Sequence, residues 1–307
     1  MLQLAGIYVP LLTPFNEDQT VNWTNLEAHI ERLIAAGVHG IFALGSTSEA
    51  FFLPLNTKKE ILQHIVRTVR GRTPIIVQTG SNVLSETIEL SKYALDQGIE
   101  VLSVITPYYY SLQEWELVGY YRYLSKRLPN VPFCVYNFAS RTRNDIHPAL
   151  LKQCKSHVEQ IVAIKESSES LERFSSLVTE NPDVAVFAGT NALILDALSL
   201  GCVGAVATLA NVLPEMVTGI YESFTAGKLD TAHQLQDTVA EVRSVLKSLG
   251  PDLQVYKLAA SVFGSYPFEG MYLPHQNLDP QDRKVIMDRL VQLQGRLENH
   301  NIKEVSS

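Results

Sequence analysis

Short apolar runs alternate with amphipathic helical patterns along most of this chain, and the alternation repeats about eight times. The runs show little polar alternation, which is typical of parallel strands that are buried on both faces. Eight strand–helix units within about 225 residues match the size of a closed (β/α)₈ barrel. The predicted strands cover residues 6–12, 40–44, 74–79, 101–105, 132–136, 160–165, 184–188 and 203–207.

The segments between these runs have the hydrophobic periodicity of helices. One of them begins near Trp23 and ends before Gly37, since glycine commonly ends a helix. Thr57 and Glu60 have the spacing of a capping box, which predicts a helix start at Thr57. A doubly wound open sheet is the alternative fold, because a local pattern cannot show closure. No GxGxxG follows the first predicted strand, which weakens a dinucleotide-binding version of that fold.

After about residue 226 the pattern becomes all-helical. No linker-like or low-complexity stretch separates this part from the rest. We therefore expect a barrel over residues 1–225 and a helical extension over residues 226–307 that packs on it.

Composition narrows the class of protein. With 46% hydrophobic and 19% charged residues, the chain can bury a large core, and its net charge of −7 disfavours a nucleic-acid partner. No apolar run approaches the roughly 20 residues that span a bilayer. The three cysteines are far apart and form no CxxC, so we expect free thiols and a cytoplasmic protein.

Lys165 directly follows the apolar run 161–164 and ends a predicted strand. Barrel active sites lie at the carboxyl ends of the strands, so we expect its amine to enter a cavity there. Burial favours the neutral amine, which is the nucleophile in Schiff-base formation. The alternative is a structural ion pair with Glu49 or Glu166.

Other strand ends carry further candidates. Tyr136 can relay protons to and from the substrate oxygen while an imine forms on a neighbouring amine, or it can be a packing residue. Ser46 and Thr47 offer hydroxyls and turn amides that suit a carboxylate, although ordinary turn chemistry explains them equally. Arg141 can clamp a carboxylate with two hydrogen bonds, or it can be a solvated loop residue. The tyrosines at 108–110 fit packing, a subunit contact or a proton relay.

These strand ends resemble the signatures of one known family, the dihydrodipicolinate synthase/N-acetylneuraminate lyase superfamily. The resemblance covers about residues 5–225, and the matching motifs occur in the family's order. They are 45–49 (Gly-Ser-Thr-Ser-Glu), 106–109 (Thr-Pro-Tyr-Tyr), 136–142 (Tyr-Asn through Ser-Arg-Thr), 164–166 (Ile-Lys-Glu) and 210–212 (Ala-Asn-Val).

The resemblance implies a class I aldolase or condensing enzyme that needs no metal and no cofactor. If this chain follows the family's pattern, Lys165 would form a Schiff base with pyruvate or another 2-oxo acid, and Tyr136 would relay protons. Thr47 would hydrogen-bond Tyr136, and Ser46 and Thr47 would hold the carboxylate of the 2-oxo acid.

The resemblance also implies a homo-oligomer, a dimer or tetramer, because Tyr109 matches a tyrosine that the family donates across a subunit interface. The backbone at Gly189 and Val206 would line the pocket. Arg141 resembles the arginine with which the synthase branch binds the carboxylate of its aldehyde substrate.

Three departures separate the chain from the synthase pattern: Ser48 and Arg143 stand where the family has glycines, and residues 268–274 differ from its C-terminal motif. We expect condensation of pyruvate with an aldehyde such as aspartate semialdehyde. The alternatives are a retro-aldol lyase for a 2-keto-3-deoxy sugar acid or 4-hydroxy-2-oxoglutarate, and a non-catalytic 2-oxo-acid sensor.

Overall fold

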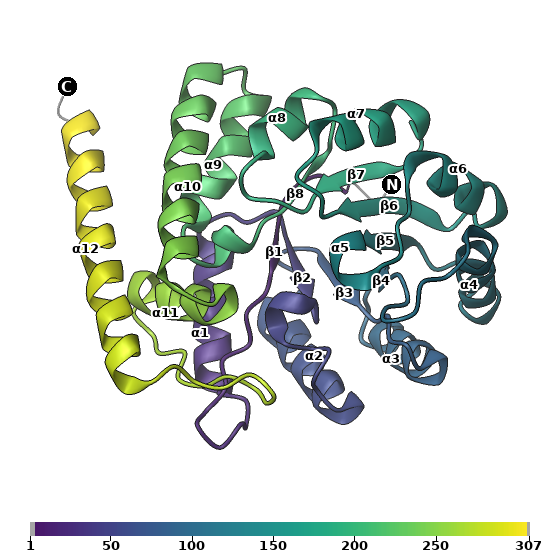
Figure 1. The fold of residues 1–307 in the computed structure, drawn as a ribbon, viewed down its shortest axis with the longest axis horizontal. Helices are drawn as coiled ribbons and strands as arrows, with labels where there is room; N and C mark the ends of the chain where they lie inside the picture. Colours follow the sequence, from purple (N-terminus) through teal and green to yellow (C-terminus); the bar gives the residue numbers. More distant parts are fainter. Residues whose placement is uncertain (1–3, 306–307) are drawn as a thin grey trace.

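Eight parallel strands close into a barrel in sequence order, with β1 pairing with both β2 and β8 (Figure 1). The computed structural model describes residues 4–305, and the side chains of residues 4–298. Closure confirms the predicted (β/α)₈ barrel and rules out the open sheet. The strands are β1 (Gly6–Pro10), β2 (Gly40–Ala43), β3 (Ile75–Gln78), β4 (Val101–Ile105), β5 (Phe133–Asn137), β6 (Ile161–Glu166), β7 (Ala185–Ala188) and β8 (Gly204–Val206).

Every predicted strand is present, and each end lies within two residues of its predicted position. The helices around the barrel are α1 (Trp23–Ala35), α2 (Leu55–Val69), α3 (Leu84–Asp96), α4 (Glu114–Arg127), α6 (Pro148–His157), α7 (Leu171–Glu180), α8 (Ile194–Ser199) and α9 (Pro214–Thr225). Short turns follow three strands: η1 (Ser46–Ser48), α5 (Ala139–Thr142) and η2 (Thr208–Asn211).

The capping box predicted at Thr57 and Glu60 is wrong. α2 begins two residues earlier, at Leu55, directly after Pro54, and no side chain caps it. Pro54 has the extended backbone of a residue that precedes a helix, so the helix begins at the next residue. A capping box is found instead at the start of α4, between Gln113 and Glu116.

The inside of the barrel is filled by side chains. Tyr8, Phe42, Tyr136, Phe187 and Val206 belong to its buried cluster, with Tyr8 and Phe187 packed edge to face at 5.2 Å. Closure also needs a residue without a side chain. A Cβ on Gly204 would lie 2.0 Å from the Gly6 carbonyl oxygen, so only glycine lets β8 approach β1 this closely.

Three further helices follow the barrel: α10 (Leu229–Leu249), α11 (Asp252–Gly264) and α12 (Pro280–Val305). They lie on the side of the barrel that carries α1 and α9, with α12 outermost (Figure 1). α10 packs against α9 and α11 against α12. The division at residue 225 stays a prediction, and the outer ends of the two segments, residues 1–3 and 306–307, lie outside the described residues.

Within the described residues, no helix is both long and apolar enough to cross a membrane. All three cysteines, Cys134, Cys154 and Cys202, are free thiols and are buried. Burial raises the pKa of each to about 12. A buried thiol with a raised pKa is inert, because the thiolate is the reactive form.

We therefore expect the folded protein to be unreactive toward a thiol reagent near pH 8. With a pKa of about 12, only about one thiol in 10⁴ is ionised at that pH, and the buried sulfur is shielded as well. Titration with Ellman's reagent should detect no thiol in the folded protein and three after unfolding in guanidinium. A thiol of the folded protein that reacts as fast as free cysteine would contradict this packing.

Candidate active site

Lys165 and Tyr136 lie side by side at the carboxyl ends of β6 and β5. The two residues are direct partners in the parallel ladder between these strands. Lys165 is only 6% exposed, and its Nζ lies 4.0 Å from the centre of the Tyr136 ring and 4.6 Å from that of Phe42. The amine therefore faces aromatic rings at the end of the barrel where the sequence places it.

The Tyr136 hydroxyl is hydrogen-bonded to a serine on the turn after β2. Its oxygen lies 3.2 Å from Ser46 Oγ. The resemblance assigns this contact to Thr47, but the partner in the structure is Ser46, while Thr47 is the next residue of the same half-buried turn. Ser48, which stands in place of the motif's glycine, closes this turn by donating from Oγ to the Gly45 carbonyl at 2.8 Å.

Neither carboxylate considered as an ion-pair partner contacts Lys165 within the described part of the chain. Glu49 is instead paired with Lys257 of α11. Glu166 accepts hydrogen bonds from Asn137 Nδ2 at 2.8 Å and from the Ser168 N–H at 2.8 Å. The reading of Lys165 as one half of a structural ion pair with Glu49 or Glu166 is therefore wrong.

The surroundings of Glu166 shift the pKa of its carboxyl group. Burial raises this pKa, and the hydrogen bonds from Asn137 and Ser168 partly offset that rise. Asn137 also donates to Asp145 and accepts from the Ile146 N–H at 2.9 Å. A single buried amide thus orients Glu166, the neighbour of Lys165, and holds the loop after β5.

Gly189 and Val206 end the two strands that follow Lys165 around the barrel. The Gly189 N–H donates to the Glu166 carbonyl at 2.6 Å. A Cβ on Gly189 would lie 2.6 Å from Ser167 Oγ and 2.8 Å from that carbonyl oxygen, so the close approach requires glycine. Val206 is 3% exposed and belongs to the same buried cluster as Tyr136.

Arg141 and Tyr109 lie farther out on the loops. Arg141 is exposed on α5, and its guanidinium lies 5.3 Å from the Phe138 ring; among the described side chains it forms no ion pair. Tyr109 is 73% exposed, has a left-handed backbone (φ 81°) and packs edge to face on Tyr110. The structure of one chain brings neither residue to Lys165.

Sequence reasoning missed the residue that joins these two loops. Asn144 is buried and donates to the carbonyls of Pro107 at 2.7 Å and Tyr110 at 2.8 Å. It also accepts from the Leu112 N–H at 2.7 Å. The loop that carries Tyr109 is therefore tied to the loop that carries Arg141. An asparagine in the loop between β5 and α6 was the available signal, although most such residues only form turns.

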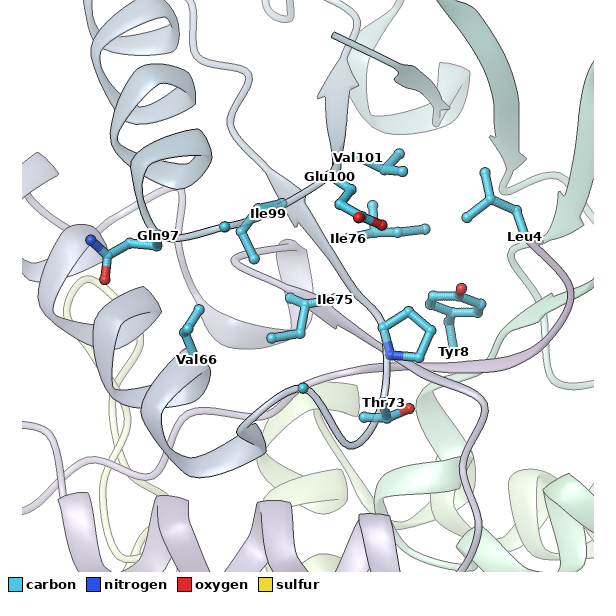
Figure 2. A pocket seen from close by; sticks show the side chains of 13 residues that line it. Leu4, Tyr8, Val66, Thr73, Ile75, Ile76, Gln97, Ile99, Glu100 and Val101 are labelled. Carbon is cyan, nitrogen blue, oxygen red and sulfur yellow. The ribbon is translucent and has the colours of Figure 1, made fainter. Parts of the chain in front are cut away.

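A cavity of about 570 Å³ lies at the opposite, amino-terminal end of the barrel. Figure 2 shows it between the ends of α2 and α3, which carry Val66 and Gln97, and the start of β1, near Leu4 and Tyr8. Among the described residues that line it there is no lysine or arginine. Because barrel enzymes react at the other end, this cavity is not the candidate active site.

Metal ligands are not gathered at the candidate site. Within the described residues, no three His, Cys, Asp or Glu side chains lie close enough together to hold a metal ion. The groups that lie at this end of the barrel are an amine over the Tyr136 ring, from Lys165, and the phenol of Tyr136 bound to the hydroxyl of Ser46. These are groups for nucleophilic attack and proton transfer.

This chain is similar in sequence to several known proteins. An uncharacterised DapA-like lyase of Halobacterium salinarum is 30% identical over 292 residues, which make up 95% of each chain. The 4-hydroxy-tetrahydrodipicolinate synthase of Methanopyrus kandleri is 31% identical over 235 residues, 76% of this chain and 78% of that one.

Among solved structures, the fold is similar to that of YagE, a prophage protein of Escherichia coli K12 from the dihydrodipicolinic acid synthase family, solved in complex with pyruvate. The TM-score is 0.89 at 28% identity, over 95% of this chain and 99% of YagE. The model of the dihydrodipicolinate synthetase family matches residues 3–292. The strand-end motifs and the closed barrel thus have one explanation: this chain is a member of the dihydrodipicolinate synthetase family of lyases.

Proposed function

We propose that the chain is a Schiff-base-forming class I aldolase whose Lys165 condenses pyruvate with an aldehyde, in the manner of a dihydrodipicolinate synthase. The observation that carries the proposal is the buried amine of Lys165, which faces Tyr136 and has no carboxylate partner among the described residues. A buried lysine that is not paired with a carboxylate keeps its amine free to attack a carbonyl carbon. The likeness to a pyruvate-bound member of the family and to a synthase supports the same donor.

The chemistry follows from three side chains. Lys165 Nζ attacks the ketone carbon of pyruvate, and Tyr136 relays the two amine protons to the ketone oxygen, which leaves as water and yields the imine. Transfer of a proton from the pyruvate methyl group to the imine nitrogen gives an enamine, which attacks the carbonyl carbon of the aldehyde. The aldehyde oxygen takes up that proton, and hydrolysis of the resulting imine releases the product and frees Lys165. Ser46 holds the Tyr136 hydroxyl in place, and Thr47, with the backbone at Gly189 and Val206, surrounds the donor.

Arg141 and Tyr109, on the outer loops, have separate proposed roles. We propose that Arg141 binds a carboxylate on the aldehyde. Tyr109 reaches the active site of a second copy in a homodimer or tetramer. Tyr109, Tyr110 and Trp115 are each more than 70% exposed. A group of exposed aromatic side chains is typical of a protein interface. A cytoplasmic location stays a prediction.

A second candidate function has one observation in its favour. The hydroxyls of Ser167 and Ser168, just past Lys165, are buried and have no hydrogen-bond partner among the described residues. Hydroxyls of this kind can bind a substrate that carries several hydroxyl groups. That substrate would be a 2-keto-3-deoxy sugar acid, and the reaction a retro-aldol cleavage. 4-Hydroxy-2-oxoglutarate, which has a single hydroxyl group, stays the other predicted cleavage substrate without this support.

Incubation with pyruvate and borohydride should attach one reduced pyruvate to Lys165. Borohydride traps the imine as a stable amine, so intact mass and peptide mapping identify the site. Lys165→Met should show no adduct, whereas Lys152→Met, which changes an exposed lysine of α6, should be labelled like the wild type. Pyruvate binding without an adduct would contradict the proposal and favour a non-catalytic sensor.

Ser46→Ala and Thr47→Val should affect different kinetic constants. Loss of the Ser46 hydroxyl misaligns the proton relay, so kcat should fall about 10- to 100-fold. Thr47→Val keeps the side-chain shape and removes one carboxylate contact, so KM for pyruvate should rise about tenfold with little change in kcat. Steady-state kinetics at varied pyruvate concentration measure both constants for each variant. A fall in kcat for Thr47→Val and a rise in KM for Ser46→Ala would show that Thr47, not Ser46, is the hydrogen-bond partner of Tyr136 in the reaction.

Assays with pyruvate plus aspartate semialdehyde, set against cleavage of the two retro-aldol substrates, should favour condensation. Arg141→Met should raise KM for the semialdehyde about 10- to 100-fold, because a charged hydrogen bond to a carboxylate is lost. The same variant should trap pyruvate at the wild-type rate. Cleavage of a 2-keto-3-deoxy sugar acid that is faster than condensation, and insensitive to Arg141→Met, would assign the second function.

A further inference from the structure

The carboxylate of Glu49 is buried and held by three donors from the C-terminal part of the chain. Its side chain is fully buried, and Lys257, whose side chain is 3% exposed, donates to its Oε1. The Tyr272 N–H donates to Oε2 at 2.9 Å, and His275 Nδ1 lies 3.0 Å from the same oxygen. A residue of the turn after β2 is thus fixed by residues more than 200 positions later.

Lys257 is itself locked in place. Its Nζ also donates to the Gly270 carbonyl at 3.0 Å and lies 4.6 Å from the centre of the Phe15 ring. The Gly270 N–H in turn donates to the Phe15 carbonyl at 2.8 Å. Burial lowers the pKa of Lys257, and the carboxylate of Glu49 opposes that shift. The pair therefore has one geometry, set by the segment after β1 and by the loop that follows α11.

Glu49 closes the turn that carries Ser46. The Glu49 N–H donates to the Ser46 carbonyl at 3.1 Å, and Glu49 has a left-handed backbone with φ 60°. Ser46 Oγ is the group that meets the Tyr136 hydroxyl at 3.2 Å. The Glu49 side chain and the Ser46 hydroxyl are therefore linked through one short turn of backbone.

A buried ion pair adds little to the stability of a folded protein, because the cost of desolvating both charges offsets their attraction. An apolar pair of similar volume would fill the same space. The charged pair instead fixes geometry, because three hydrogen-bond donors contact the Glu49 carboxylate and hold it in one position.

We propose that Glu49 and Lys257 are positioning residues for the reaction, which set the Ser46 hydroxyl against Tyr136 and make α11 part of the catalytic unit. The proposal rests on the proposed Schiff-base function. Neither residue contacts the reacting atoms. Both act through the turn of residues 46–48.

The test is a double-mutant cycle of Glu49→Gln with Ser46→Ala. Glu49→Gln keeps the size of the side chain and removes its charge, and kcat should fall about tenfold or more through misplacement of the relay. In the Ser46→Ala background the same change should lower kcat less than about twofold, because the group that it positions is gone. Effects on kcat that multiply independently would overturn the proposal.

Lys257→Met is a second, independent test of the positioning role, and Leu290→Ala is the control for a loss of stability. Lys257→Met should lower kcat like Glu49→Gln, and its effect should likewise vanish in the Ser46→Ala background. Leu290 is a fully buried residue of α12 and is not among the contacts of Glu49 or Lys257. Leu290→Ala should lower the midpoint of thermal unfolding and leave kcat within about twofold at a temperature where the variant is folded. A comparable fall in kcat for Leu290→Ala would show a merely structural effect and overturn the proposal.

Failure of the proposed function is a separate result. It appears as a wild-type protein that forms no pyruvate adduct with borohydride. Hydrogen exchange of the peptide 45–52 then decides the positioning role without any reaction. Faster exchange in Glu49→Gln and in Lys257→Met, but not in Leu290→Ala, supports it, and unchanged exchange in the first two overturns it.

Discussion

Parallel closure of the eight strands is the constraint on which the rest of the structure depends. A parallel ladder brings every carboxyl end to the same rim, so residues far apart in sequence converge there without any contact designed between them. Lys165 is beside Tyr136 because the two strands are in register. Ser46 reaches them across the barrel mouth. Closure in turn requires glycine at 204, where the first and last strands meet.

This constraint explains why so much could be predicted from the sequence. Apolar runs and helical periodicity are local signals, and they located all eight strands. The order of the strands then placed Lys165 and Tyr136 at one rim. The burial of the amine also followed, because four apolar residues precede Lys165 in the same strand. The family resemblance added which of the strand-end polar residues to watch, above all at 45–49.

Other features could not be predicted, because they depend on side-chain direction or on distant contacts. Ser46 and Thr47 are adjacent in a short turn, and only its backbone conformation decides which hydroxyl faces Tyr136. The two positions that lack the family's glycines behave differently: Arg143 has a left-handed backbone, with φ 66°, whereas Ser48 lies in the regular part of η1. Lys257 lies in an amphipathic helix, where a lysine normally faces solvent, and nothing local indicates its partner.

The distant contacts also bear on the amine. Glu49, after β2, and Glu166, at the end of β6, are the two carboxylates considered as partners of Lys165, and a pair with either would occupy its amine. Glu49 already accepts from Lys257, Tyr272 and His275, and Glu166 from Asn137 and Ser168. Each carboxylate thus has donors of its own, and Lys165 is left to aromatic rings. α11 and the loop after it therefore serve the proposed chemistry in two ways: they hold the turn that carries Ser46, and they occupy the Glu49 carboxylate, which leaves the amine of Lys165 unpaired.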